Sequence, residues 1–471
     1  MHATGFQEAA FERWQALAGK ALKGAPLDAL QSTTDEGIQL DPLYPPSDAA
    51  ALPLRGGGTP WVISQRIDHP DPAKAADQLM AELEGGATGL LLSAQGAPGA
   101  LGYGIKSDAL GTLLDGVLVD AVRISFEPGP ARIRGARHLA SELAASTPPN
   151  RSITVDFGLD APSLLAATGG LRGSPETTQE AQSKHLEELA SHGFGGTIYR
   201  ADGRVVHRAG GTDAQELGFV LASFVFMLKS GGDPSFQAEN TLLGVAVDAD
   251  QFAGVAKLRA LRLLHAKLLE AAGLPPTRAT IAAETSGRML TRRDAHVNML
   301  RATTATFAAA IGGADIITAL PFSQGLGYPD AFARRTARNT QLVLMSESHL
   351  YQVDDPAAGS GLHEAYTQAL CEKAWAFFQS IEAQGGVVEA LVSGHIQRAV
   401  AEAQAARAQE IASGARKLTG STIYQLQTEY PVEVEAVERS AEPLKDDLAT
   451  YCEPLPVVPL EPSVSVDEGS A

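Results

Sequence analysis

Cysteine is nearly absent from this sequence, and so are long apolar segments and an excess of positive charge. The two cysteines among 471 residues, Cys371 and Cys452, supply neither a disulfide framework nor a cysteine-rich metal site, which is typical of a reducing compartment. Acidic residues outnumber basic ones by 55 to 37, and the net charge of −18 disfavours nucleic acid and anionic membranes as partners. The longest apolar run, residues 218–228, is shorter than the roughly 20 residues of a membrane-spanning helix. The amino terminus has no basic start followed by an apolar run, so we expect no signal peptide and a cytoplasmic protein.

Short apolar runs alternate with amphipathic segments from Thr88 onward, and seven of these runs predict buried strands. They are TGLLLS, AVRISFE, RSITVDFG, GGTIYRA, LLGVAVDA, ATIAAETS and ADIITAL. The clearest intervening helix is expected over about residues 252–272, with Gly273 as its stop signal. The number of strand–helix alternations favours a (β/α)8 TIM barrel over an open doubly wound sheet. Functional groups would then lie at the carboxyl ends of the strands.

The composition divides the chain into four expected parts. The Pro-rich stretch LDPLYPPSDAAALPLRGGGTPW belongs to an extended N-terminal arm that could lie over a partner. The last segment has six prolines and contributes −8 to the net charge, so we expect it to be extended or disordered. The parts are an arm over residues 1–60, a barrel over 61–385, a helical appendage over 386–430 and an acidic Pro-rich tail over 431–471.

Local motifs considered singly do not define a reaction. Asp294 and His296 could pair as a metal-bound histidine and its orienting carboxylate, but two residues that begin a helix favour a capping role for Asp294. Arg334, Arg335 and Arg338 could hold a phosphate, although a charged outer helix face is the preferred interpretation. The Gly-rich turn in HRAGGTDAQELGF could present backbone N–H groups to an anion, but Gly-Gly turns are common.

Several long stretches, taken in order, match one protein family. ETSGRMLT and the later VNMLRATTATFAAAIGGADIITALPFSQGLGYPDAFARRTARNTQLVL are similar to a family segment that typically begins TSGWSLT and later reads ARNTQ. FAGVAKLRALRLLHAKLL, DPAAGS, EKAWAFFQSIEAQGG and TTDEGIQLDPLY match other segments of the same family. The likeness extends from about Trp14 to Tyr424 and is weaker over residues 68–194. The chain resembles the methylmalonyl-CoA mutases.

This resemblance implies a radical enzyme that uses adenosylcobalamin to move a thioester group between adjacent carbons, inside a closed, dry barrel. The cobalamin domain of the family carries D-x-H-x-x-G, in which the histidine coordinates cobalt. The one D-x-H sequence here runs from Asp294 to His296, and Met299 stands where the glycine belongs. No cobalamin domain is expected after the helical appendage.

The substrate site also departs from the family pattern. Active chains resemble YATMYAGRPWTIRQYAG, whereas LRGGGTPWVISQRID keeps Pro60 and Trp61 but loses the tyrosine stretch. The catalytic histidine of the family lies in a run like YHMQEAGA, and RVVHRAGG places Val205 at that position. Arg288 replaces the tryptophan of TSGW. We interpret seven residues as vestigial barrel-mouth positions: His207, Thr285, Ser286, Gly287, Arg288, Asn298 and Arg301.

The resemblance is strongest to the small, non-catalytic subunit of a heterodimeric methylmalonyl-CoA mutase, which interconverts methylmalonyl-CoA and succinyl-CoA in propionate metabolism. A large partner subunit would bind adenosylcobalamin and substrate, and this chain would supply no catalytic, cofactor-binding or metal-binding residue. Two alternatives are open: a substrate-binding subunit of another acyl-CoA mutase that uses a separate cobalamin-binding protein, and a free-standing CoA-binding or regulatory barrel. We also expect side chains to fill the barrel centre and the arm, up to about Gly58, to contact the partner.

Overall fold

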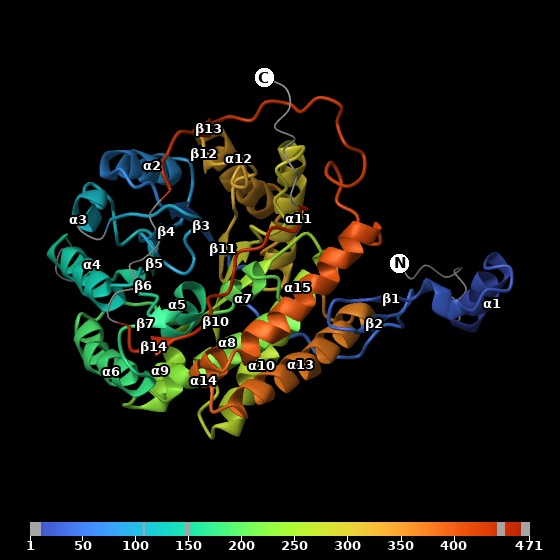
Figure 1. Cartoon of the computed structure of the whole chain (residues 1–471), viewed down its shortest axis with the longest axis horizontal. Coiled ribbons are helices and arrows are strands. Elements are labelled where there is room, and N and C mark those ends of the chain that lie inside the picture. The colour runs from blue at the N-terminus through green and yellow to red at the C-terminus, as the bar shows by residue number, and fades with distance from the viewer. Residues whose placement is uncertain (1–10, 107–108, 147–150, 440–447, 463–471) are drawn as a thin grey trace.

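The computed structural model describes residues 11–106, 109–146, 151–439 and 448–462, and its centre is one eight-stranded parallel sheet (Figure 1). The strand order is β6-β5-β4-β3-β11-β10-β9-β8. The two ends of this sheet meet, because the Val155 N–H donates to the Gly195 carbonyl at 2.9 Å and the Arg200 N–H donates to the Leu159 carbonyl at 3.2 Å. The expected (β/α)8 barrel is therefore confirmed.

Each of the seven predicted runs overlaps a barrel strand, and the eighth strand is β3. The barrel strands are β3 (Val62–Ile67), β4 (Gly89–Ser93), β5 (Arg123–Glu127), β6 (Thr154–Asp156), β8 (Tyr199–Asp202), β9 (Thr241–Val247), β10 (Thr280–Thr285) and β11 (Ile316–Thr318). The pattern did not predict β3, because Ser64, Gln65 and Arg66 interrupt its apolar run. All three polar residues are buried, so this strand faces a polar interior.

Helices form a layer around the sheet (Figure 1). They are α2 (Pro72–Glu84), α3 (Leu110–Leu113), α4 (Arg132–Ser146), α5 (Ala161–Thr168), α6 (Pro175–Ser191), α8 (Asp213–Leu228), α9 (Pro234–Glu239), α10 (Gln251–Ala271), α11 (Asn298–Ile311), α12 (Ala331–Leu342) and α13 (Gly361–Glu382). The predicted helix over 252–272 is α10, which Asp250 caps by accepting from the Ala253 N–H at 3.0 Å. No helix in the described ranges is both long enough and apolar enough to span a bilayer.

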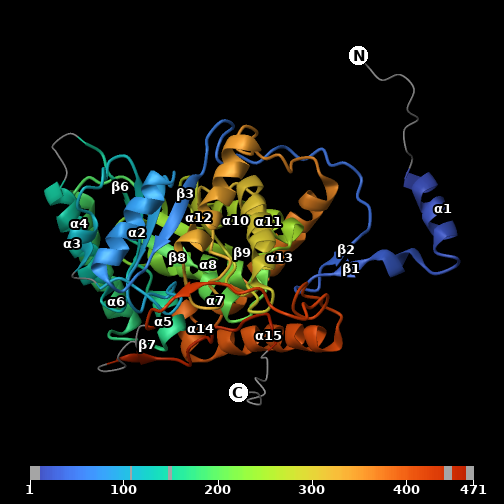
Figure 2. The ribbon, with the colours of Figure 1, turned by 90° about the horizontal axis from the view of Figure 1, so that it is seen from above.

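Short elements connect this layer to the rest of the chain. They are η1 (Leu27–Leu30), β1 (Ser32–Thr33), β2 (Gln39–Leu40), β7 (Gly170–Leu171), α7 (Arg204–Arg208), η3 (Ala295–Val297), β12 (Tyr328–Pro329), the π-helical turn η4 (Val343–Glu347), α14 (Val387–Val392), α15 (His395–Ser413), β13 (Val434–Glu435) and β14 (Thr450–Tyr451). The helices α14 and α15 occupy the segment for which we expected a helical appendage. Figure 2 shows α15 and the described part of the tail, residues 448–462, along one side of the barrel.

The N-terminal arm has two structurally different parts. Its first helix, α1 (Phe11–Ala21), contains no buried residue and lies apart from the barrel in Figure 2. Farther along the arm, Ile38 and Leu54 are buried, and Arg55 donates to the Ala314 carbonyl at 2.7 Å. Only the second part of the arm is therefore fixed to this chain's own barrel.

The C-terminal tail is extended but packed over residues 448–462. The strand β14 pairs antiparallel with β7, and Leu455 is buried. This segment is extended, which is one of the two expected states. Leu455 and Glu461 are buried against the barrel, whereas Tyr451 and Val457 are exposed. Residues 440–447 and 463–471 of the tail lie outside the described residues.

Candidate functional site

Charged side chains occupy the barrel axis. Arg66, on β3, lies 3.1 Å from the Glu127 carboxylate and 2.6 Å from the Glu284 carboxylate. Arg204, just beyond β8, also contacts both carboxylates, and its Nη1 is 2.9 Å from Glu284 Oε2. The whole set, called the axial network here, consists of Arg66, Glu127, Arg200, Asp202, Arg204, Arg208 and Glu284, all buried.

The axial network keeps its carboxylates ionised. Burial by itself would raise the pKa of Glu284, but the guanidinium groups of Arg204, Arg66 and Arg208 lower it to about 2. The pKa of Glu127 is likewise well below its usual value, although burial opposes this shift. Between these side chains the axial cavity measures about 10 Å³. The expectation of a filled barrel centre is confirmed.

His207 lies at the rim of this network, on α7. Its Nε2 is 2.7 Å from Ser286 Oγ, and its Nδ1 is 3.5 Å from the Glu216 carboxylate. The imidazole is completely buried. Burial first, and then the nearby Arg288 guanidinium, lower the pKa of His207 to about 4. The structure therefore places a neutral histidine in a closed hydrogen-bonded pair with Ser286.

A group with metal-ligand spacing surrounds this histidine. One ligand atom each from His207, Asp213 and Glu216 lies within 4.8 Å of the others. The Lys257 Nζ is 2.6 Å from both carboxylates and donates to the Ala246 carbonyl at 2.8 Å. The ammonium group of Lys257 thus provides the positive charge that a metal ion would bring to this cluster.

The loop that follows β10 is also held by internal hydrogen bonds. Thr285 Oγ1 accepts from the Leu320 N–H at 2.8 Å. Arg288 donates to the backbone carbonyls of His207 at 3.1 Å and Gly211 at 3.0 Å. His207, Ser286 and Arg288 are therefore brought together, and their polar groups face one another.

Asn298 and Arg301 form a second group. Arg301 Nη1 donates to Asn298 Oδ1 at 2.7 Å, and the Asn298 amide donates to the carbonyls of Thr291 at 2.8 Å and Phe322 at 3.0 Å. Arg301 also donates to the Thr419 carbonyl at 2.6 Å. These bonds fix the turn before α11, which is a structural role.

The C-terminal tail crosses the barrel mouth, the end of the barrel where the strands terminate. The Val458 N–H donates to the Arg208 carbonyl at 2.8 Å, and the Leu460 N–H donates to the Arg288 carbonyl at 2.9 Å. Beneath the tail is a cavity of about 640 Å³, which Gly287 also lines. The tail therefore covers the face at which function would be expected in a barrel.

Replacing Glu461 with alanine is expected to loosen this cover. The buried Glu461 carboxylate accepts from the Arg292 N–H at 2.5 Å and from Ser421 Oγ at 2.7 Å. Losing these bonds should cost about 1–3 kcal/mol and speed hydrogen exchange at Val458 and Leu460. Exchange at these amides should stay unchanged in Glu453→Ala, since Glu453 is exposed. Equal exchange in both variants would contradict the assigned contact.

The D-x-H sequence is not arranged as a cofactor ligand. Asp294 is the N-cap residue of η3, but it adopts a positive φ of 43° and its side chain makes no capping hydrogen bond. Its N–H instead donates to the Glu429 carboxylate at 2.8 Å. The His296 ring packs against Phe322, with centroids 5.4 Å apart, and against Tyr430. This arrangement does not fit a corrin ring, which the histidine would have to approach through open space.

The three arginines of α12 have different environments. Arg335 is exposed, as expected for an outer helix face. Arg338 is buried and pairs with Glu82, and Arg334 lies over the Tyr328 ring at 4.5 Å. The outer-face interpretation is therefore wrong for Arg338, because a buried carboxylate on α2 compensates its charge.

The sequence patterns missed the axial network. One signal could have found it, because Glu127, Asp202 and Glu284 each lie at or next to the carboxyl end of a barrel strand. A carboxylate in that position points toward the barrel mouth or axis. Their arginine partners come from other strands, and no local spacing connects them.

Comparisons with known proteins find relatives of this chain in one family. A family model described as methylmalonyl-CoA mutase matches residues 173–452. The methylmalonyl-CoA mutase small subunit of Streptomyces virginiae is 37% identical over 92% of this chain and 73% of its own length. That of Propionibacterium freudenreichii subsp. shermanii is 32% identical over 88% of this chain and 68% of its own. The methylmalonyl-CoA mutase of Rhizobium meliloti is 27% identical over 92% of this chain and 66% of its own length. The chain belongs to the methylmalonyl-CoA mutase family.

Proposed function

We propose that this chain is the structural small subunit of a heterodimeric methylmalonyl-CoA mutase, an isomerase that interconverts methylmalonyl-CoA and succinyl-CoA. A large partner subunit binds adenosylcobalamin and the substrate, and this chain supports it without contributing a reacting group. The relatives named as small subunits support the pairing. We also propose a cytoplasmic location, which the free thiols of Cys371 and Cys452 support.

The axial network is the single observation that carries this proposal. A substrate chain threaded along the axis would have to displace Arg66 and Arg204 from Glu127 and Glu284. Separating one buried pair leaves a charge without compensation and costs about 3–5 kcal/mol. The barrel is thus stable only when its centre is closed to substrate, which suits a supporting subunit.

The environment of His207 gives independent support. A general acid or base has to reach the proton that it transfers. Both imidazole nitrogens of His207 face this chain's own groups, Ser286 on one side and Glu216 on the other. The proposal therefore assigns His207 to the structure of the rim.

The test compares the purified chain, with adenosylcobalamin and methylmalonyl-CoA, with the complex formed with the large subunit. We expect no turnover from the chain alone and full turnover from the complex. Within the complex, Ser286→Ala in this chain should leave kcat and KM within about twofold of the parent values. Turnover by the chain alone would overturn the proposal. Turnover that requires only a short cobalamin-binding protein would favour the substrate-binding alternative.

A further inference from the structure

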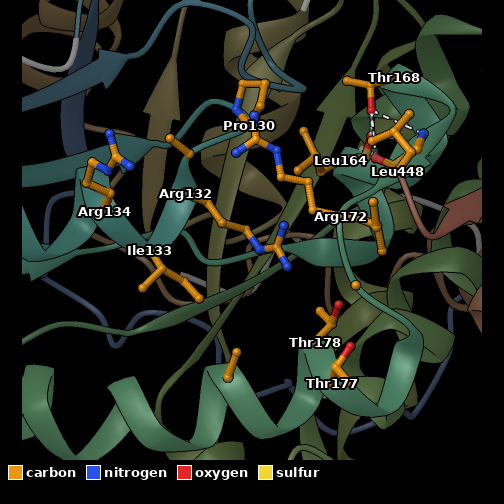
Figure 3. A pocket seen from close by; sticks show the side chains of 15 residues that line it. Pro130, Arg132, Ile133, Arg134, Leu164, Thr168, Arg172, Thr177, Thr178 and Leu448 are labelled. Carbon is orange, nitrogen blue, oxygen red and sulfur yellow. Dashed lines mark hydrogen bonds between the residues drawn. The ribbon is translucent and has the colours of Figure 1, made fainter. Parts of the chain in front are cut away.

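A pocket of about 420 Å³ lies beside α4 and α6, and no residue of the axial network lines it (Figure 3). The first turn of α4 forms one wall and the first turn of α6 forms another. This volume is within the range of about 300–1,000 Å³ that is usual for small-molecule sites. No group considered for the mutase reaction lines it.

Two arginine side chains extend into the middle of this pocket. Figure 3 shows the guanidinium groups of Arg132, from α4, and Arg172, from the segment after β7, pointing into the same space. Arg134 also lines the pocket, but its guanidinium group points away from the centre. The pocket therefore holds two cations, Arg132 and Arg172. A third cation, Arg134, is nearby but points elsewhere.

The two converging cations have no counter-charge in contact with them. Among the described residues, the guanidinium groups of Arg132 and Arg172 form no ion pair or hydrogen bond, and the Arg132 Nε is buried without a partner. Burial lowers the pKa of Arg132 to about 10, and the attraction of Asp160 offsets this only in part. Charge buried in this way is unfavourable unless an anion compensates it.

The fully buried Arg259 is paired with carboxylates, whereas the half-buried Arg132 is not. Arg259 is paired with Asp355, and its Nη2 lies 2.6 Å from the Glu364 carboxylate. Two carboxylates therefore compensate the buried charge of Arg259. Arg132 differs from Arg259 in opening onto a cavity instead of a carboxylate.

The rest of the lining indicates the kind of anion. Backbone N–H groups in the first turn of α4 lack partners within the helix, and the positive end of its dipole faces the pocket. The α6 side adds the hydroxyl groups of Thr177 and Thr178. Leu164 and Leu448 add an apolar surface. Two guanidinium groups beside hydroxyl and N–H donors suit a phosphate, and the leucines suit a small apolar group attached to it.

We propose that this pocket binds a small phosphate monoester, with its phosphate between Arg132 and Arg172 and its organic part against Leu164 and Leu448. The site is built from this chain and shares no lining residue with the cavity beneath the tail. It is therefore independent of the mutase proposal, and either one can fail without the other.

Calorimetric titration of the full chain with phenyl phosphate and with inorganic phosphate tests the site. We expect phenyl phosphate to bind more tightly, because only it reaches the leucines. Arg172→Gln and Arg132→Gln should each weaken phenyl phosphate binding at least about tenfold. Arg134→Gln, the matched control, should leave the affinity unchanged. Added salt should weaken binding to the parent chain, since the attraction is electrostatic.

Two results would overturn the proposal. The first is no binding of either probe to the parent chain. The second is an equal loss of affinity in all three arginine variants, which would indicate a general effect of net charge. If Arg132→Gln does not fold, Arg172→Gln carries the test, because Arg172 is exposed.

Discussion

Replacing Glu284 with glutamine is expected to destabilise the folded chain by about 3–5 kcal/mol. The carboxylate accepts from Arg66, Arg204 and Arg208, and all four residues are buried. The amide has nearly the same shape but no charge, so three guanidinium groups would share too little negative charge. Urea unfolding followed by circular dichroism measures the change in the free energy of unfolding.

An exposed ion pair provides the matched control for this prediction. The Lys267 Nζ is 2.8 Å from the Glu270 carboxylate, but both side chains are more than half exposed. Glu270→Gln should leave the urea midpoint unchanged, because solvent screens such pairs. A Glu284→Gln midpoint equal to that of the Glu270 variant would show that the axial network does not hold the barrel together.

Acid should reproduce the effect of Glu284→Gln. The pKa of Glu284 falls from an ordinary value of 4.5 to about 2 on folding, so ionisation favours the folded state. The stabilisation is complete above about pH 4.5 and is lost as the pH falls toward 2. The Glu284→Gln variant should show less of this acid-dependent loss, since its residue 284 has no proton to take up.

Deleting residues 1–30 is expected to abolish co-purification with the large subunit. The helix α1 has 11 residues, which is too short to be stable in isolation, where about 12–15 are marginal. Phe11 is 43% and Leu17 is 57% exposed, and the Phe11 ring stacks on Trp14. Burying these side chains on a partner would contribute about 1.5–3 kcal/mol each, so the deletion should raise Kd by about a thousandfold.

Deleting residues 1–30 tests partner binding more specifically than removing the whole arm. Leu54 and Arg55 contact the barrel, so removing them would damage the chain itself. Deleting only the detached part should leave the thermal midpoint unchanged. Leu17→Ser should weaken pairing, whereas Leu118→Ser, at a residue 69% exposed in the loop after α3, should not. Pairing that survives deletion of residues 1–30 would show that the large subunit binds elsewhere.

Periodicity predicted the barrel because its strands are apolar on the faces that the helices cover. Periodicity did not predict β3, because Arg66 interrupts the apolar run of this strand. The Arg66 side chain belongs to the axial network. Polar residues elsewhere in this fold are also buried. His265 on α10 is 3% exposed, and its ring packs against Phe224.

The candidate site was predictable only in part. The departures from the family pattern predicted a centre without catalytic groups, and Arg288 and His207 do lie at the rim. What fills the centre could not be read from the sequence, because its ion pairs join distant segments. In the sequence, Glu127 is separated from Arg204 by 77 positions, and His207 from Ser286 by 79 positions. The packing of the tail was missed for the same reason, since its apolar partners belong to the barrel.

The axial network also determines how rarely the barrel opens. Its contacts join β3, β5, β8 and β10, and the pair of Arg66 and Glu284 closes a loop of 218 residues. Contacts of this kind form after the strands have met, so we expect them to be absent from the folding transition state. We then expect them to slow unfolding without accelerating folding, which would give the chain kinetic persistence beyond its equilibrium stability. Such persistence would suit the supporting role that we propose for this chain.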